Sequence, residues 1–176
     1  MKSEFNPFEN RRSRDIRNRL GSALIDSIHK GDLKPVRQAA AAFDLGKEEH
    51  RTAEYVENRM TRYETVLEKI RAQRIPPEEL YWIADLLWCE DLFFECHEWL
   101  EQNWQTVSGL EKTILQALIR SAGAFEFLTW DRTQSARLTA SKALSVLYCH
   151  RENIPARFSI NPKIKCLEKL VSELPD

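Results

Sequence analysis

Three ionisable residues and a tryptophan fall on consecutive turns of one predicted helix. The segment from Phe93 reads Phe-Phe-Glu-Cys-His-Glu-Trp-Leu-Glu-Gln-Asn-Trp. At about 100° per residue, Glu101 lies about 40° from His97 and Trp104 about 20° to the other side, with Glu98 at the edge of this stripe. An imidazole and a carboxylate four residues apart can bind one cation together or can bond to each other. The spacing therefore predicts a shared polar site.

The stripe resembles the zinc-protease pattern His-Glu-x-x-His, in which the intervening Glu is the general base. Here Glu101 replaces the second His. This leaves His97 and Glu101 as two candidate ligands for a divalent metal such as zinc, and Glu98 as the residue that polarises water. In the alternative interpretation, His97 and Glu101 form a structural polar link inside a helical core.

A metal site of this kind requires a third protein ligand, which the spacing does not identify. The candidates are His29, His50, His150 and Glu126. Gln116, on the next predicted helix, could reach the polar stripe if its face turns inward.

The composition limits both the fold and the functions. Five Gly in 176 residues disfavour Gly-rich phosphate loops and tight-turned β structure. The 26 basic and 27 acidic residues give a formal charge of −1, which disfavours a fold built to bind nucleic acid. No apolar run is long enough to span a membrane, and the N-terminus lacks the apolar region of a secretory signal. Four unpaired Cys fit reduced thiols in the core of a cytoplasmic protein.

Apolar residues recur with helical spacing through most of the chain, and we expect an all-α array of about seven or eight helices. Ser13, Asp32, Asp91 and Asp131 are predicted helix N-caps, and Gly31 is a predicted stop. The predicted helices include segments 47–73, 92–106, 108–128 and 131–148, and a terminal helix from Asn161. The seam of Met60, Tyr63 and Leu67 could face either this chain's core or another subunit, so a homo-oligomer is possible.

Ile75-Pro76-Pro77 is the clearest boundary, because proline restricts the preceding residue and removes a backbone donor. It separates an N-terminal helical extension, residues 1–75, from a core at 76–176 that contains the polar stripe. We expect the two parts to share a single core. Residues Ser108 to Glu111 form a Ser-x-x-Glu capping box for the next helix, and the small residues 121–124 would allow the His97 helix to cross it.

The ordered segments Leu92–Glu101, Leu115–Ile119 and Ser135–Leu138, together with Trp104, resemble the bacterial family catalogued as domain of unknown function 309. The resemblance implies a compact helical fold, in which the His-Glu-x-x-Glu-x-x-Trp helix packs on the helix that carries Gln116. It also implies a metal-dependent hydrolase with His97, Glu98, Glu101, Trp104 and Gln116 at its site. The family often has a His where this chain has Phe127, which removes a natural third ligand.

Three hypotheses follow for the function. In the first, the protein is a metal-dependent hydrolase that uses the residues just named. In the second, it is a non-catalytic helical module that binds a partner, and the polar cluster is structural. In the third, Trp99 or Trp104 walls a pocket for a small ligand.

Overall fold

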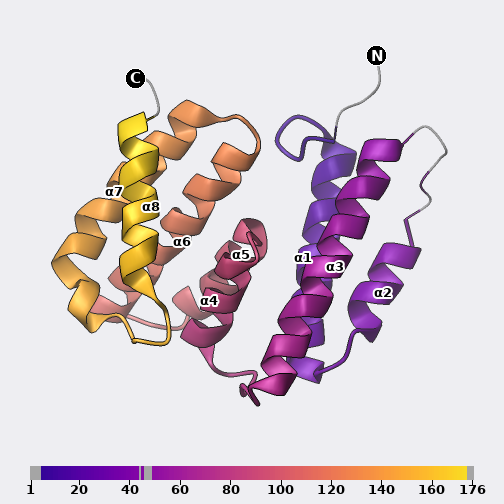
Figure 1. Cartoon of the computed structure of the whole chain (residues 1–176), viewed down its shortest axis with the longest axis horizontal. Coiled ribbons are helices and arrows are strands. Elements are labelled where there is room, and N and C mark those ends of the chain that lie inside the picture. The colour runs from indigo at the N-terminus through magenta and orange to yellow at the C-terminus, as the bar shows by residue number, and fades with distance from the viewer. Residues whose placement is uncertain (1–4, 44, 46–48, 174–176) are drawn as a thin grey trace. The chain divides into compact units, whose positions relative to one another are not determined.

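The expected all-α class is confirmed. A computed structural model describes residues 5–43, 45 and 49–173, and in these residues it contains eight α-helices, one short 3-10 helix and no strand (Figure 1). The α-helices are α1 (Arg11–Lys30), α2 (Lys34–Ala41), α3 (His50–Ala72), α4 (Leu80–Cys89), α5 (Phe93–Trp104), α6 (Gly109–Thr129), α7 (Thr133–His150) and α8 (Ile160–Glu173), and the 3-10 helix η1 is Arg151–Asn153. Within the described residues, no helix combines the length and the apolar character needed to cross a bilayer.

The chain divides into two compact units after Pro77. Unit 1 is Met1–Pro77 and unit 2 is Glu78–Asp176. Whether the two units share one core, as expected from the sequence, stays a prediction. Their charges differ in sign: unit 1 has 16 Lys or Arg and 12 Asp or Glu, a formal charge of +4, whereas unit 2 has 10 and 15, a formal charge of −5.

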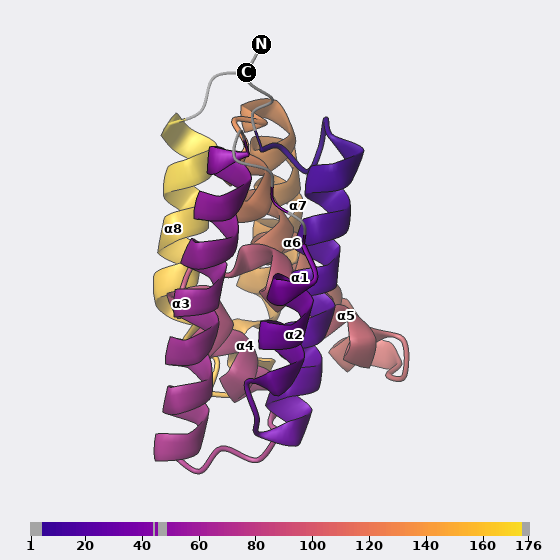
Figure 2. The same ribbon diagram turned by 90° about the vertical axis from the view of Figure 1, so that its right-hand side faces the viewer.

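In unit 1, α1 and α3 lie side by side, and α2 packs against both (Figures 1 and 2). α1 contributes a fully buried stripe that includes Leu20 and Leu24. On α3, Tyr63 is 0% and Leu67 is 5% exposed. Two residues of the α3 seam are therefore buried, whereas its third residue, Met60, is half-buried, and a homo-oligomer through this seam stays a prediction.

In unit 2, each helix packs mainly against its neighbours in the chain, from α4 through α8. The centre is an aromatic cluster in which the ring of Trp88 from α4 meets Phe93, Phe125 and Phe158, with ring centroids 5.3, 5.2 and 6.4 Å away. The indole N–H of Trp99 donates to the backbone oxygen of Leu80 at 3.0 Å, which ties α5 to the start of α4. All five Trp of the chain belong to this unit.

Four helices end in the same backbone motif, with one residue in the left-handed conformation. These residues are Gly31 after α1, Arg74 after α3, Asp91 after α4 and Asp131 after α6, with φ between 52° and 63°. In each case two backbone N–H groups bond back to carbonyls of the last turn, for example Leu92 to Leu87 at 2.9 Å. The prediction that Asp91 and Asp131 are N-caps was wrong, because they terminate the preceding helices instead. Asp tolerates this conformation better than most residues.

The other predicted caps were partly right. α1 is capped by the Asn10 side chain, which accepts from the N–H of Ser13 at 3.1 Å, so Ser13 is not the cap. Leu33, not the predicted Asp32, occupies the N-cap position of α2, although the Asp32 carboxylate accepts from the N–H of Lys34 at 3.1 Å. Ser108 occupies the N-cap position of α6, but its side chain makes no capping hydrogen bond.

A buried ion pair fixes the start of α8 against α4. The Lys163 side chain, 4% exposed, donates to Asp85, which is 16% exposed and also accepts from the backbone N–H of Ser159 at 2.9 Å. Because α7 connects to α8 through the irregular segment 154–159, this carboxylate holds a part of the chain that lacks a regular hydrogen-bond ladder.

We predict that Asp85→Ala destabilises unit 2 by about 3–5 kcal/mol, because it leaves a buried ammonium without a partner. The double variant Asp85→Leu with Lys163→Met should recover most of this loss, since both charges are then removed. Urea unfolding followed by Trp fluorescence measures the change, and all its signal comes from unit 2. Lys165→Met, at an exposed position of α8, should stay within about 0.5 kcal/mol of the parent. An Asp85→Ala protein as stable as this control would contradict the prediction.

Candidate functional site

The polar stripe of α5 lies beside the buried face of the helix, partly against α6 and partly open to solvent. The buried residues Glu95, Cys96, Trp99 and Leu100 span an arc that is centred about 150° from the midpoint of His97 and Glu101, whereas the buried Phe94 falls within the polar stripe. The side chains of His97, Glu98 and Glu101 are therefore 31%, 40% and 43% exposed. The cluster is half-buried, not buried as expected from the sequence, and water can reach its carboxylates.

The three side chains converge at His97. Its Nδ1 atom lies 3.3 Å from Glu98 Oε1 and 3.8 Å from Glu101 Oε2. One ligand atom from each residue lies within 4.8 Å of the other two, close enough for one metal ion to contact all three. The Nδ1 atom is shielded from solvent, and the ion-pair contacts include no well-aligned hydrogen bond to it. Glu98, expected at the edge of the stripe, is the nearer of the two carboxylates.

α6 supports the imidazole from the other side. A Cβ atom placed on Gly123 would lie 3.8 Å from His97 Cδ2, and Ser121, Ala122 and Ala124 beside it are buried. The prediction that the His97 helix crosses α6 at residues 121–124 is therefore confirmed. The small side chains allow α6 to approach α5 closely, which positions the imidazole.

Gln116 and Trp104 extend the site less than expected. Gln116 is half-buried on α6 and makes no hydrogen bond to the cluster among the described residues. It lies seven residues before Gly123, about two helical turns away on the same face. Trp104 is also half-buried; its indole N–H is shielded and has no hydrogen-bond partner among the described residues, and the ammonium of Lys112 lies 4.4 Å from the centre of its ring. Trp104 thus makes a cation–π contact with Lys112.

No further residue of the described chain joins the ligand group. Glu126 is buried and accepts a hydrogen bond from the indole N–H of Trp130 at 3.1 Å. Phe127 lies one turn after Gly123 on the same face of α6, so a His there would stand near His97. His150 ends α7 outside the group, and His29 and His50 belong to unit 1.

The Asp85–Lys163 pair was not predicted, although the sequence carries a signal for it. Lys163 falls on the apolar stripe of α8, between Ile160 and Ile164, where a solvated lysine would not be expected. The pair lies near Cys96, which is 0% exposed, and burial raises the pKa of that thiol. The buried Cys96 thiol is therefore held in its protonated form, which is the less reactive one. The other three cysteines are exposed, which corrects the expectation that the thiols lie in a core.

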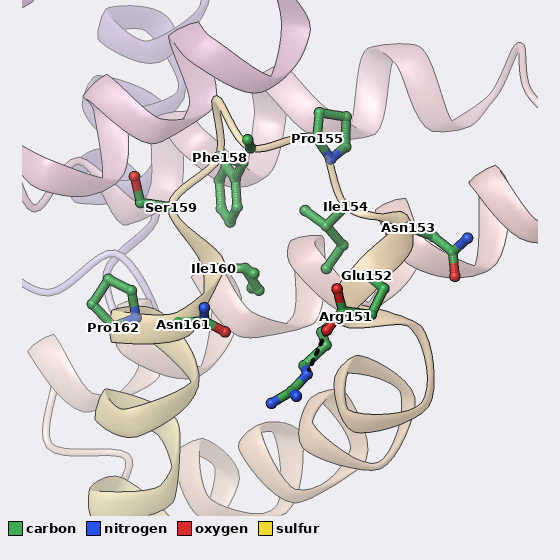
Figure 3. Close-up of a pocket in the computed structure, with 11 residues that line it drawn as sticks. Arg151, Glu152, Asn153, Ile154, Pro155, Phe158, Ser159, Ile160, Asn161 and Pro162 are labelled. Carbon is green, nitrogen blue, oxygen red and sulfur yellow. Dashed lines mark hydrogen bonds and ion pairs between the residues drawn. The ribbon is translucent and has the colours of Figure 1, made fainter.

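A hollow of about 650 Å³ lies in unit 2 where α7 turns into α8 (Figure 3). The side chains of Ile154, Phe158 and Ile160 point into it, and Arg151 at its mouth is paired with Glu152 at 3.1 Å. None of the cluster residues lines it. This hollow is not the pocket that was expected beside Trp99 or Trp104. Trp99 is 2% exposed and packs in the core.

Comparison with known proteins places the site in a family segment. Residues 81–138 match the family described as Domain of unknown function (DUF309). The match covers α5, α6 and all the cluster residues, and it confirms the resemblance noted in the sequence. Residues 81–138 are thus similar to this family of unknown function. No curated protein and no solved structure matches the chain.

We predict that Gly123→Ala stabilises the protein by about 0.5–1 kcal/mol, because alanine favours a helix interior and its methyl group would make only an ordinary contact with His97. Urea unfolding by Trp fluorescence tests this. Gly123→Leu should instead destabilise unit 2, since its longer side chain must displace the imidazole. If Gly123→Ala were as destabilising as Gly123→Leu, the close support of His97 by α6 would be tighter than the structure indicates.

Proposed function

We propose that His97, Glu98 and Glu101 bind a divalent metal ion such as zinc and that the protein is a metal-dependent hydrolase. The single observation that supports this most directly is the convergence of an imidazole and two carboxylates within 4.8 Å of one another. Nitrogen and carboxylate oxygen are ordinary zinc ligands, and the shielded Nδ1 has no well-aligned hydrogen bond that a metal would have to replace.

The exposure and charge of the site agree with this proposal. All three donors come from α5, so one side of the group faces away from the protein and leaves room for water and a substrate. Unit 2 has a formal charge of −5, which attracts cations. A bound metal would polarise a substrate carbonyl or phosphoryl oxygen.

Glu98 has two possible roles within this proposal. As a general base it would accept a proton from a water molecule beside the site while His97 and Glu101 bind the metal. As a third ligand it would use the same carboxylate that now lies 3.3 Å from the imidazole. We favour the general base, because a hydrolase needs a group that takes this proton and no other carboxylate joins the group in the described residues.

The second candidate function is a non-catalytic module in which the cluster stabilises the fold. The distances of 3.3 and 3.8 Å support it, because a protonated His97 would pair with both carboxylates. The exposure argues against it: ion pairs that are a third or more exposed contribute about 0–1 kcal/mol.

We predict that the full chain, purified without an affinity tag, binds one equivalent of zinc. Glu101→Gln and His97→Ala should each weaken zinc binding at least about tenfold, since each removes a ligand. Competition with a chromophoric zinc chelator measures the affinity. Glu173→Gln, at an exposed site at the end of α8, is the control and should bind zinc as the parent does. Well below one equivalent of zinc in the parent would contradict the proposal.

Glu98→Gln separates the two roles of this residue. If Glu98 is the general base, Glu98→Gln should remove the base and leave zinc bound. Hydrolysis of p-nitrophenyl acetate or bis-p-nitrophenyl phosphate by the zinc-loaded protein should then fall by about 10²–10⁴-fold. If Glu98→Gln instead loses zinc as Glu101→Gln does, Glu98 is a ligand. Parent protein that binds zinc but hydrolyses neither ester faster than free zinc would count against the hydrolase and leave the metal site standing.

His97→Ala should also change the stability of unit 2 by no more than about 1 kcal/mol, because the ion pairs that it removes are partly exposed. Thermal and urea unfolding without metal give this value. A loss of about 3–5 kcal/mol, typical of a broken buried pair, would favour the structural module.

A further inference from the structure

A second candidate site lies in unit 1, where α1 and α3 end next to each other. A hollow of about 330 Å³ is formed there by side chains from both helices and from the segment that leaves α3. Its apolar lining is Ile28, Leu67, Ile70, Ile75 and Pro77, and its polar lining is His29, Lys30, Arg71 and Arg74. This volume falls within the range of small-molecule sites.

The charges around this hollow are all of one sign. Lys30, Arg71 and Arg74 are permanently cationic at neutral pH, and no acidic residue lines the hollow. The Arg71 guanidinium donates to the backbone oxygen of Gly31 at 3.4 Å, and neither Lys30 nor Arg74 has an ion-pair partner in the described part of the chain.

Basic residues at helix C-termini often serve only to balance the helix dipole, which is the simpler explanation. Each C-terminus is equivalent to roughly −0.5 charge, so α1 and α3 together balance about one of the three cations. About two positive charges remain, within a unit whose own formal charge is +4. Dipole compensation alone therefore does not account for the cluster.

Arg74 is held in an unfavourable backbone conformation. Its φ is 54°, at the position of the α3 end motif that glycine usually occupies. A side chain with Cβ is strained there, and strained residues cluster at functional sites. The arginine at this position supplies a guanidinium beside the hollow, whereas a glycine would supply no side chain.

We propose that this hollow binds a small amphipathic anion, with a doubly charged head group of the phosphate type and a short apolar body. Lys30, Arg71 and Arg74 contact the head group, and the apolar body lies against Ile28 and Ile70. Two charges on the ligand match the two uncompensated charges of the hollow. The proposal does not depend on the His97 cluster.

Phenylphosphonate is the probe, because it carries the head group and an apolar ring and cannot be hydrolysed as an ester. Isothermal titration calorimetry of the full chain at pH 8 with EDTA keeps any metal at the His97 cluster out of the measurement. Phenylphosphonate should bind more tightly than inorganic phosphate, which lacks the ring, and than benzyl alcohol, which lacks the charge. Equal binding of either comparison compound would overturn the proposal, as would no phenylphosphonate binding at millimolar concentration.

Variants separate binding from folding. Arg74→Gln keeps the backbone strain and most of the stem, and it should weaken phenylphosphonate binding at least about tenfold. Arg74→Gly should raise the melting temperature, followed by circular dichroism, and still weaken binding, because it relieves strain and removes the guanidinium. Arg11→Gln, at a side chain that is 93% exposed, is the control for the change in charge and should bind as the parent does. Loss of affinity in Arg11→Gln equal to that in Arg74→Gln would show a nonspecific charge effect and overturn the proposal.

Discussion

The burial of one face of α5 decides where the candidate catalytic side chains lie. Cys96, Trp99 and Leu100 pack inwards, and the indole N–H of Trp99 anchors the helix to the Leu80 carbonyl. With 3.6 residues per turn, a helix held in this way keeps His97 and Glu101 off the face that carries Cys96, Trp99 and Leu100 and leaves them partly open to solvent. The small residues of α6 then allow the two helices to approach until His97 rests near Gly123. The cluster is thus held by a helix hairpin, which positions side chains more firmly than a loop does.

The connections between helices show how a chain with few glycines makes tight reversals. After α4 and α6, an Asp in the left-handed conformation ends the helix, and the next helix begins at the second residue after it. Each non-glycine residue in this conformation costs roughly 1–2 kcal/mol, which the two backbone hydrogen bonds of the motif and the packing of the next helix offset. The same geometry after α3 uses Arg74, a residue with no short polar group to favour it. The strain at Arg74 is therefore of a different kind from that at the two Asp residues.

The helices could be predicted well because apolar spacing reports directly on burial. The boundary at Pro76-Pro77 could be predicted because proline lacks a backbone donor in any structural context. The sequence also predicted the polar stripe of α5 and its crossing with α6, for the same reason as the helices. It did not predict the roles of Asp91 and Asp131, because Asp is favoured both at N-caps and in the left-handed turn, and only the backbone path decides between them. The exposure of His97 and the pairing of Lys163 with Asp85 depend on which helices pack together. No local pattern encodes that choice.

A formal charge of −1 for the whole chain conceals two units of opposite sign, and this difference connects the two candidate sites. In the unit with a charge of −5, two carboxylates surround an imidazole; in the unit with a charge of +4, three cations surround a hollow without an acid. At physiological ionic strength a charge is screened over about 8 Å, so binding at either site depends on these local groups. The charge of each unit acts at longer range by raising the local concentration of oppositely charged ligands. The composition of the whole chain thus excludes a protein of high net charge, but it does not exclude strongly charged local sites.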